Sequence, residues 1–134
     1  YGIADSREEL EASFADAEKN RITKPAVIEK IGGKVADFET GGGNIIVRTE
    51  DGELYTWGYD GGSFTCVNEK SEFVLKPQKI DFPAAVTRMS IGNFAGAAIT
   101  ESGRAFAWGS GYYCIYTDDT YAKSHTPREL LFGK

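Results

Sequence analysis

Few side chains in this sequence have the types and the spacing that catalysis requires. The single histidine, His125, lies in the stretch AKSHTPREL, and no serine or cysteine forms a recognisable nucleophile pattern with it. A general base has to lie within hydrogen-bond reach of a substrate proton. We therefore predict that His125 is an ordinary exposed residue, that there are no catalytic residues, and that the protein is not an enzyme.

One acidic pair and two glycine-rich stretches are the candidates for holding a metal ion or a phosphate. Asp118 and Asp119 lie in YTDDTY, which lacks the D-x-D-x-D-G pattern of a calcium loop. The stretches TGGGN and YDGGS neither precede a helix nor contain the lysine of a phosphate-binding loop. Solvated acids and tight turns account for these residues, so we expect no metal ion and no cofactor.

The two cysteines occupy similar places in the sequence. Cys66 lies nine residues beyond Trp57, and Cys114 lies six residues beyond Trp108. Two cysteines without metal-type spacing are too few for a disulfide scaffold. They can form one disulfide if their Cα atoms come within about 7 Å. Two free thiols are the alternative, and the sequence leaves both open.

Composition indicates a globular chain rich in β-structure. Of the 134 residues, 41% are hydrophobic and 26% are charged, which excludes a disordered chain. Sixteen glycines and an aromatic content of 13% favour a turn-dense β-fold. The net charge of -5 argues against nucleic-acid binding. No apolar run approaches the roughly 20 residues that span a bilayer, so we expect no membrane insertion.

The first 24 residues differ from the rest. Ser6 and Glu9 form a capping box, which predicts a helix over residues 6–20 that ends before Pro25. Its narrow apolar stripe consists of Leu10, Phe14 and Ala17. A helix this short is marginal alone in water, so the stripe has to pack on the main body or dock on a partner. Because the chain begins at Tyr1 without a methionine, we expect a processed organellar or secreted form, or a fragment.

A sequence repeat organises the remainder of the chain. Val35–Gly58 aligns with Val86–Gly109 at an offset of 51 residues without insertion, and Tyr55 aligns with Phe106. The identical pairs are Val35/Val86, Gly41/Gly92, Thr49/Thr100, Glu50/Glu101, Gly52/Gly103, Trp57/Trp108 and Gly58/Gly109. Prolines at 25, 77 and 127 each open a short strand ahead of a repeat. A period near 50 residues with about four short strands is typical of a β-propeller blade.

The shared residues have structural explanations. Gly52 and Gly103 suit the positive φ angles of a two-residue hairpin. Trp57 and Trp108 end the following strand with large apolar side chains that can pack between neighbouring blades. The glycine after each tryptophan lets the chain turn where a side chain would clash. These residues therefore predict structure and no ligand.

Each repeat has the pattern V-x5-G, followed by T-x-x-G-x-x-aromatic-x-W-G and then by a proline. Over residues 25–134 this pattern resembles the repeat of the regulator-of-chromosome-condensation (RCC1-type) β-propellers. The resemblance implies a mostly β fold of two four-stranded antiparallel blades preceded by the helix. Residues 1–24 form the extension, 25–76 and 77–126 the repeats, and 127–134 the start of a third. Family propellers commonly close with about seven blades, and some promote nucleotide exchange on small GTPases.

Two blades cannot close a propeller, which leaves three explanations: a fragment, a ring of several copies, or a two-blade module within a large complex. We expect a protein–protein interaction module, an accessory or scaffolding subunit whose partners are other protein subunits. An exchange-factor fragment and a proteinaceous enzyme inhibitor are the alternatives. A loop with Tyr112, Tyr113, Tyr116 and Tyr121 suits an interface, or packs inward over the second blade.

Overall fold

The computed structural model describes residues 15, 19, 24–28, 30–59, 73–110 and 123–131. Most of the helix expected over residues 6–20 therefore lies outside the described residues, including Leu10 and Phe14 of its apolar stripe. The same holds for Cys66, Cys114 and the four tyrosines of the second long loop. Both alternatives for the cysteines, one disulfide or two free thiols, stay predictions, as do the helix and the tyrosine contacts.

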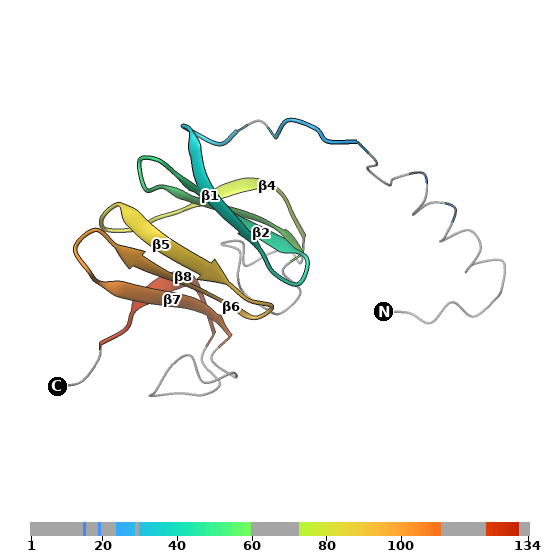
Figure 1. Ribbon diagram of the computed structural model, residues 1–134. Helices are drawn as coiled ribbons and strands as arrows, with labels where there is room; N and C mark the ends of the chain where they lie inside the picture. Colours follow the sequence, from blue (N-terminus) through green and yellow to red (C-terminus); the bar gives the residue numbers. More distant parts are fainter. Residues whose placement is uncertain are drawn as a thin grey trace.

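The described residues form two four-stranded antiparallel sheets that lie one above the other in Figure 1. The first sheet contains β1 (Val35–Thr40), β2 (Asn44–Thr49), β3 (Leu54–Tyr59) and β4 (Phe73–Ile80). The second sheet contains β5 (Val86–Ile91), β6 (Ala95–Thr100), β7 (Ala105–Ser110) and β8 (Lys123–Glu129). In each sheet the strands pair in chain order. The predicted fold class, mostly β with two antiparallel blades, is confirmed.

The sequence repeat reappears in the backbone. The β1–β2 ladder shifts register between Val35 and Asp37, and the β5–β6 ladder shifts at the equivalent pair, Val86 and Arg88. Register shifts also recur where β3 meets β4 and where β7 meets β8. Gly58 and Gly109 adopt φ angles of 116° and 113° beside these shifts. Because only glycine adopts such angles without strain, the Trp-Gly pairs position the two bulges.

The hairpin between the second and third strand of each sheet is longer than the sequence suggested. The Thr49 amide donates to the Glu53 carbonyl over 2.9 Å, which leaves the three residues 50–52 as the loop. The second sheet repeats this with Thr100 and Arg104 at 3.0 Å. A turn that ends in a left-handed glycine builds such a three-residue loop, and Gly52 has a φ of 80°. The expected two-residue hairpins are therefore wrong, although the glycine has the expected conformation.

The core lies between the two sheets. The first sheet contributes Ile46, Leu54 and Ile80. The second contributes Val86, Met89, Ile91, Ala98 and Trp108. Phe82, in the connection between the sheets, packs edge-on against Phe106 and Trp108 at ring distances of 5.6 Å and 5.8 Å. The connection therefore contributes a side chain to the same core that the sheets form.

The two motif tryptophans differ in burial. Trp108 is fully buried between the sheets, whereas Trp57 is half-buried. Trp108 pairs with Gly96, and a Cβ at position 96 would overlap the indole ring. Trp57 pairs with Ile45 and lies on the same face of the first sheet as Val47 and Phe38, opposite to the face of Ile46. The difference in burial therefore follows from the face on which each tryptophan lies, because the face with Trp108 packs on the first sheet and the face with Trp57 points away from the second.

We predict unequal effects of two equivalent substitutions, Gly52→Ala and Gly103→Ala. Gly103 has a φ of 77° and open space around a Cβ, so Gly103→Ala should lower the free energy of unfolding by about 1 kcal/mol. A Cβ at Gly52 would lie 2.7 Å from the Ala85 side chain, so Gly52→Ala should cost roughly 1–3 kcal/mol more. Urea unfolding followed by tryptophan fluorescence measures both. Equal losses would contradict this close approach of the two sheets.

Candidate protein-interaction surface

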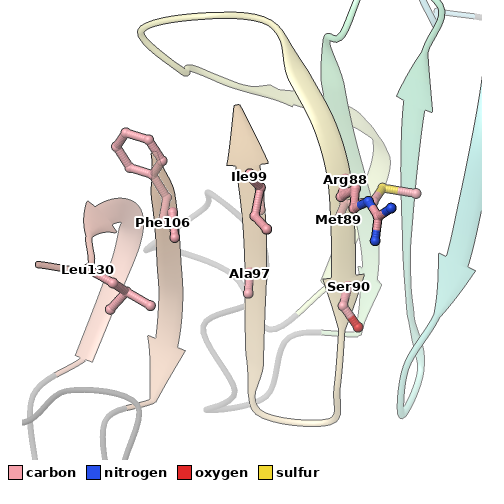
Figure 2. Close-up of a pocket in the computed structure, with 9 residues that line it drawn as sticks. Arg88, Met89, Ser90, Ala97, Ile99, Phe106 and Leu130 are labelled. Carbon is pink, nitrogen blue, oxygen red and sulfur yellow. The ribbon is translucent and has the colours of Figure 1, made fainter. Parts of the chain in front are cut away.

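The sheet face of β5–β8 that points away from the first sheet, here called the outer face, is not covered by any of the described elements. It carries Arg88, Ser90, Ala97, Ile99, Ala105 and Leu130 around a hollow of about 260 Å³ (Figure 2). Ile99 is 41% exposed. The surface of the hollow is almost entirely apolar. An apolar hollow on an ordered sheet is a feature that protein interfaces use.

The equivalent face of the first sheet is covered. Ile46, Leu54 and Ile80 occupy the places of Ala97, Ala105 and Leu130, and all three are buried against the second sheet. β2 is accordingly buried or half-buried along its whole length, whereas β6 alternates between buried and exposed residues. The outer face therefore has the position of an inter-sheet contact but has smaller side chains and, among the described residues, no covering sheet.

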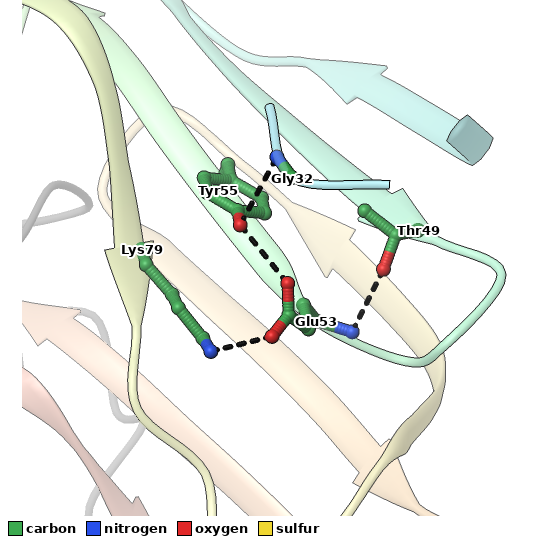
Figure 3. A network of polar contacts seen from close by, with 5 residues as sticks. All are labelled: Gly32, Thr49, Glu53, Tyr55 and Lys79. Atoms are coloured by element: carbon green, nitrogen blue, oxygen red, sulfur yellow. Dashed lines mark hydrogen bonds and ion pairs between the residues drawn. The ribbon is translucent and has the colours of Figure 1, made fainter. Parts of the chain in front are cut away.

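A polar network surrounds the start of β3 in the first sheet (Figure 3). The Lys79 ammonium lies 2.5 Å from a Glu53 carboxylate oxygen, and the Tyr55 hydroxyl donates to the other oxygen at 2.9 Å. The Tyr55 hydroxyl also accepts from the Gly32 amide at 3.2 Å, and the Thr49 hydroxyl accepts from the Glu53 amide at 3.1 Å. These contacts tie the segment before β1 to β3 and β4.

The second sheet has an ion pair at the same place with the charges exchanged. Tyr55 pairs with Lys79 in the first sheet, and Phe106 pairs with Glu129 in the second. Arg104 stands where the first sheet has Glu53, and it donates to both carboxylate oxygens of Glu129 at 2.8 Å and 2.6 Å. Its guanidinium lies 5.3 Å from the centre of the Phe106 ring. Both repeats therefore have an ion pair at this place, but the acidic and the basic residue have exchanged positions.

Both ion pairs shift the pKa values of their members. The hydrogen bond from Lys79, followed by the one from Tyr55, lowers the pKa of Glu53, and Glu53 raises the pKa of Lys79. The hydrogen bonds from Arg104 lower the pKa of Glu129. Because the pairs are in contact with solvent, they contribute little to global stability and mainly fix local geometry.

The motif glycines and tryptophans lie in the frame of the sheets, and Gly52 also lines a polar hollow of about 200 Å³ beside Glu53 and Lys79. A Cβ at Gly41 would lie 2.6 Å from the Gly92 carbonyl oxygen, which places both glycines at the contact between the sheets. Within the described ranges, no group of three His, Cys, Asp or Glu side chains could hold a metal ion. In the same part of the chain no helix is long and apolar enough to cross a bilayer.

The connections that hold the predicted interface residues join equivalent points of the two sheets. Residues 60–72 link Tyr59 to Phe73, which pair, and residues 111–122 link Ser110 to Lys123, which also pair. Both connections therefore start and end at the same position of the repeat. The outer face was not among the predicted sites; its signal in the sequence is the small residues of AGAAIT at the place of NIIVRT.

Comparison with known proteins agrees with this geometry. No family model matches the sequence. A regulator of chromosome condensation from Drosophila melanogaster is 35% identical over 75 residues, which cover 55% of this chain. These findings support an RCC1-type repeat family for the chain. It spans only 14% of that relative's length.

Two solved structures share the fold of these RCC1-type repeats. Human WBSCR16 matches with a TM-score of 0.67 and 22% identity over 78% of this chain and 27% of its own. Prp20p from Saccharomyces cerevisiae, described with its binding to Gsp1p and histones, matches with a TM-score of 0.67 and 16% identity, over 80% of this chain and 27% of its own. At these identities the likeness shows the β-propeller fold of the repeats alone.

We predict that the ion pair of the second repeat can be moved into the first. Lys79→Glu places two carboxylates side by side and should lower the melting temperature. Adding Glu53→Arg and Tyr55→Phe should restore it, because Arg104, Phe106 and Glu129 form a pair at that position. Thermal unfolding of the single and triple variants measures this. A triple variant no more stable than Lys79→Glu would show that the two positions are not interchangeable.

The pKa shift of Glu53 predicts a pH dependence. A carboxyl whose pKa is lower in the folded state than its ordinary 4.5 stabilises the fold above that value, and the contribution is lost as the pH falls through the folded pKa. Wild type should therefore lose slightly more stability below about pH 4.5 than Glu53→Gln, the difference being small because the pair is exposed to solvent. Urea titrations over the acid range measure the difference. Parallel profiles for the two proteins would contradict it.

Proposed function

We propose that this chain is a non-enzymatic protein-interaction module that serves as an accessory or scaffolding subunit of a larger complex. The observation that supports this most directly is the apolar outer face of β5–β8, which is open where the matching face of the first sheet is buried. Exposed apolar patches on ordered sheets mark sites where proteins bind. The net charge of -5 favours protein partners over nucleic acid.

The connections 60–72 and 111–122 are the second proposed contact region. They leave equivalent ends of the two sheets, so their attachment points repeat along the molecule. The second connection contains Tyr112, Tyr113, Tyr116 and Tyr121. Tyrosine combines a large apolar surface with a polar tip, which suits an interface core. The stripe of Leu10 and Phe14 in the proposed extension 1–24 supplies a third contact.

The proposed division of the chain follows the repeat. Residues 25–76 and 77–126 are the two RCC1-type repeats, and residues 127–134 begin a third. Support comes from Ile80 and Leu130, which occupy the same place beside Leu54 and Ala105 respectively. β8 therefore completes the second sheet with a strand that crosses the boundary between residues 126 and 127, as β4 crosses the boundary between residues 76 and 77.

A nucleotide-exchange role is the alternative, because Prp20p is described with its binding to Gsp1p. Release of fluorescent GDP from Gsp1p tests it directly. We expect no acceleration by this chain, since two sheets offer only part of a propeller face. Accelerated release would contradict a purely scaffolding role.

We predict that the tagged chain, expressed in its native cells, elutes in an assembly that contains other proteins at stoichiometric amounts. Replacing Tyr112, Tyr113, Tyr116 and Tyr121 with Ser should shift it toward the free form, because the partner loses its apolar contacts. Size exclusion with quantitative mass spectrometry measures both. Leu75→Ser, a change at an exposed residue of β4, is the matched control and should elute like wild type. A wild-type chain that elutes without other proteins would refute the proposal.

A further inference from the structure

The contact between the two sheets, here called the inner junction, has two halves with separate residues. The first sheet supplies the receiving half, which contains Ile46, Leu54 and the Gly52 carbonyl. The second sheet supplies the inserting half, in which Val86 and Met89 are 1% and 8% exposed. The Val86 amide donates to the Gly52 carbonyl over 2.9 Å. Each half has an equivalent in the other repeat.

The equivalent receiving half is the outer face of the second sheet. Ala97, Ala105 and Gly103 occupy the places of Ile46, Leu54 and Gly52. A Cβ added at Gly103 would meet no atom within 4 Å, whereas one at Gly52 would lie 2.7 Å from Ala85 and from the Val86 amide nitrogen. Among the described residues, therefore, no atom fills at Gly103 the space that Ala85 and Val86 fill at Gly52.

The equivalent inserting half belongs to the first sheet and is exposed. Val35 and Phe38 occupy the places of Val86 and Met89, and they are 46% and 62% exposed. In the inner junction Met89 shares a buried cluster with Ile46 and Leu54. Phe38 is larger than Met89, and Ala97 and Ala105 are smaller than Ile46 and Leu54. The size changes compensate, so Phe38 suits the hollow between Arg88 and Leu130.

We propose that the outer face of β5–β8 receives the β1–β4 sheet of a second copy of this chain. Val35 and Phe38 of one copy lie over Ala97 and Ala105 of the next, and the Val35 amide donates to the Gly103 carbonyl. The proposal rests on the proposed interaction role and deepens it by naming what covers the outer face; other proteins would then contact the connections 60–72 and 111–122. Residues 24–28 align with the part of β4 that contains Pro77, and β4 pairs with β3. On the receiving sheet the equivalent place beside β7 is already taken by β8, so residues 24–28 of the inserting copy lie beside β8. Such head-to-tail contacts extend into rings or filaments.

Two variants that each remove one half of the contact test the proposal. Phe38→Glu places a charge on the inserting half, and Ala97→Glu places one in the hollow of the receiving half. Light scattering after size exclusion should show wild type rising above the 14.6 kDa of one chain as concentration increases. Each variant alone should stay at that mass. An equimolar mixture should form a species of twice that mass, because each variant retains the half that the other lacks.

Leu75→Glu is the control, since Leu75 is 85% exposed and belongs to neither half, and it should associate like wild type. Thermal unfolding shows that the variants fold. The proposal is overturned if wild type stays at the mass of one chain, if association survives either substitution, or if the mixture forms no dimer. Wild type that is monomeric here but elutes with other proteins from cells overturns self-association alone. Association here without other proteins from cells overturns the accessory role alone.

Discussion

The close approach of the two sheets is the constraint on which the rest of the structure depends. It requires glycine at both ends of β2: a Cβ at Gly41 would lie 2.6 Å from the Gly92 carbonyl oxygen, and one at Gly52 would lie 2.7 Å from Ala85. Between these two points lies the apolar core that includes Ile46. Dispersion attraction falls steeply when packed surfaces separate. A larger side chain at position 41 or 52 would therefore weaken the packing along the whole contact between the sheets.

Within this frame the two repeats differ where the backbone leaves a choice. Strand pairing places Glu53 beside Lys79 and Arg104 beside Glu129, and either order of charge satisfies the attraction. The aromatic residue next to each pair differs accordingly: the Tyr55 hydroxyl donates to a carboxylate, whereas the Phe106 ring accepts a guanidinium over its face. One geometry is therefore kept by two different sets of side chains.

The sequence was sufficient to predict the two sheets, because Gly52, Trp57 and Gly58 act on their own turns and bulges and recur at a fixed offset. The predicted length of the hairpin loop was wrong. The Thr49 amide donates to the Glu53 carbonyl, which makes the loop three residues long, and the glycine alone does not reveal this bond. The outer face could not be predicted. Its exposure depends on what covers β6. Burial of a tryptophan likewise depends on whether its face of the sheet meets the other sheet, as at Trp108, or points away from it, as at Trp57.

The outer strands of the sheets favour association through faces over association through edges. Pro77 in β4 and Pro127 in β8 have no amide to donate to an added strand, and Lys76 and Arg128 lie beside them. On the opposite edge, the bulge between Val35 and Asp37 interrupts the regular spacing of β1. The apolar faces have no such protection. A partner therefore gains more by stacking on a sheet, as the second repeat stacks on the first, than by extending one.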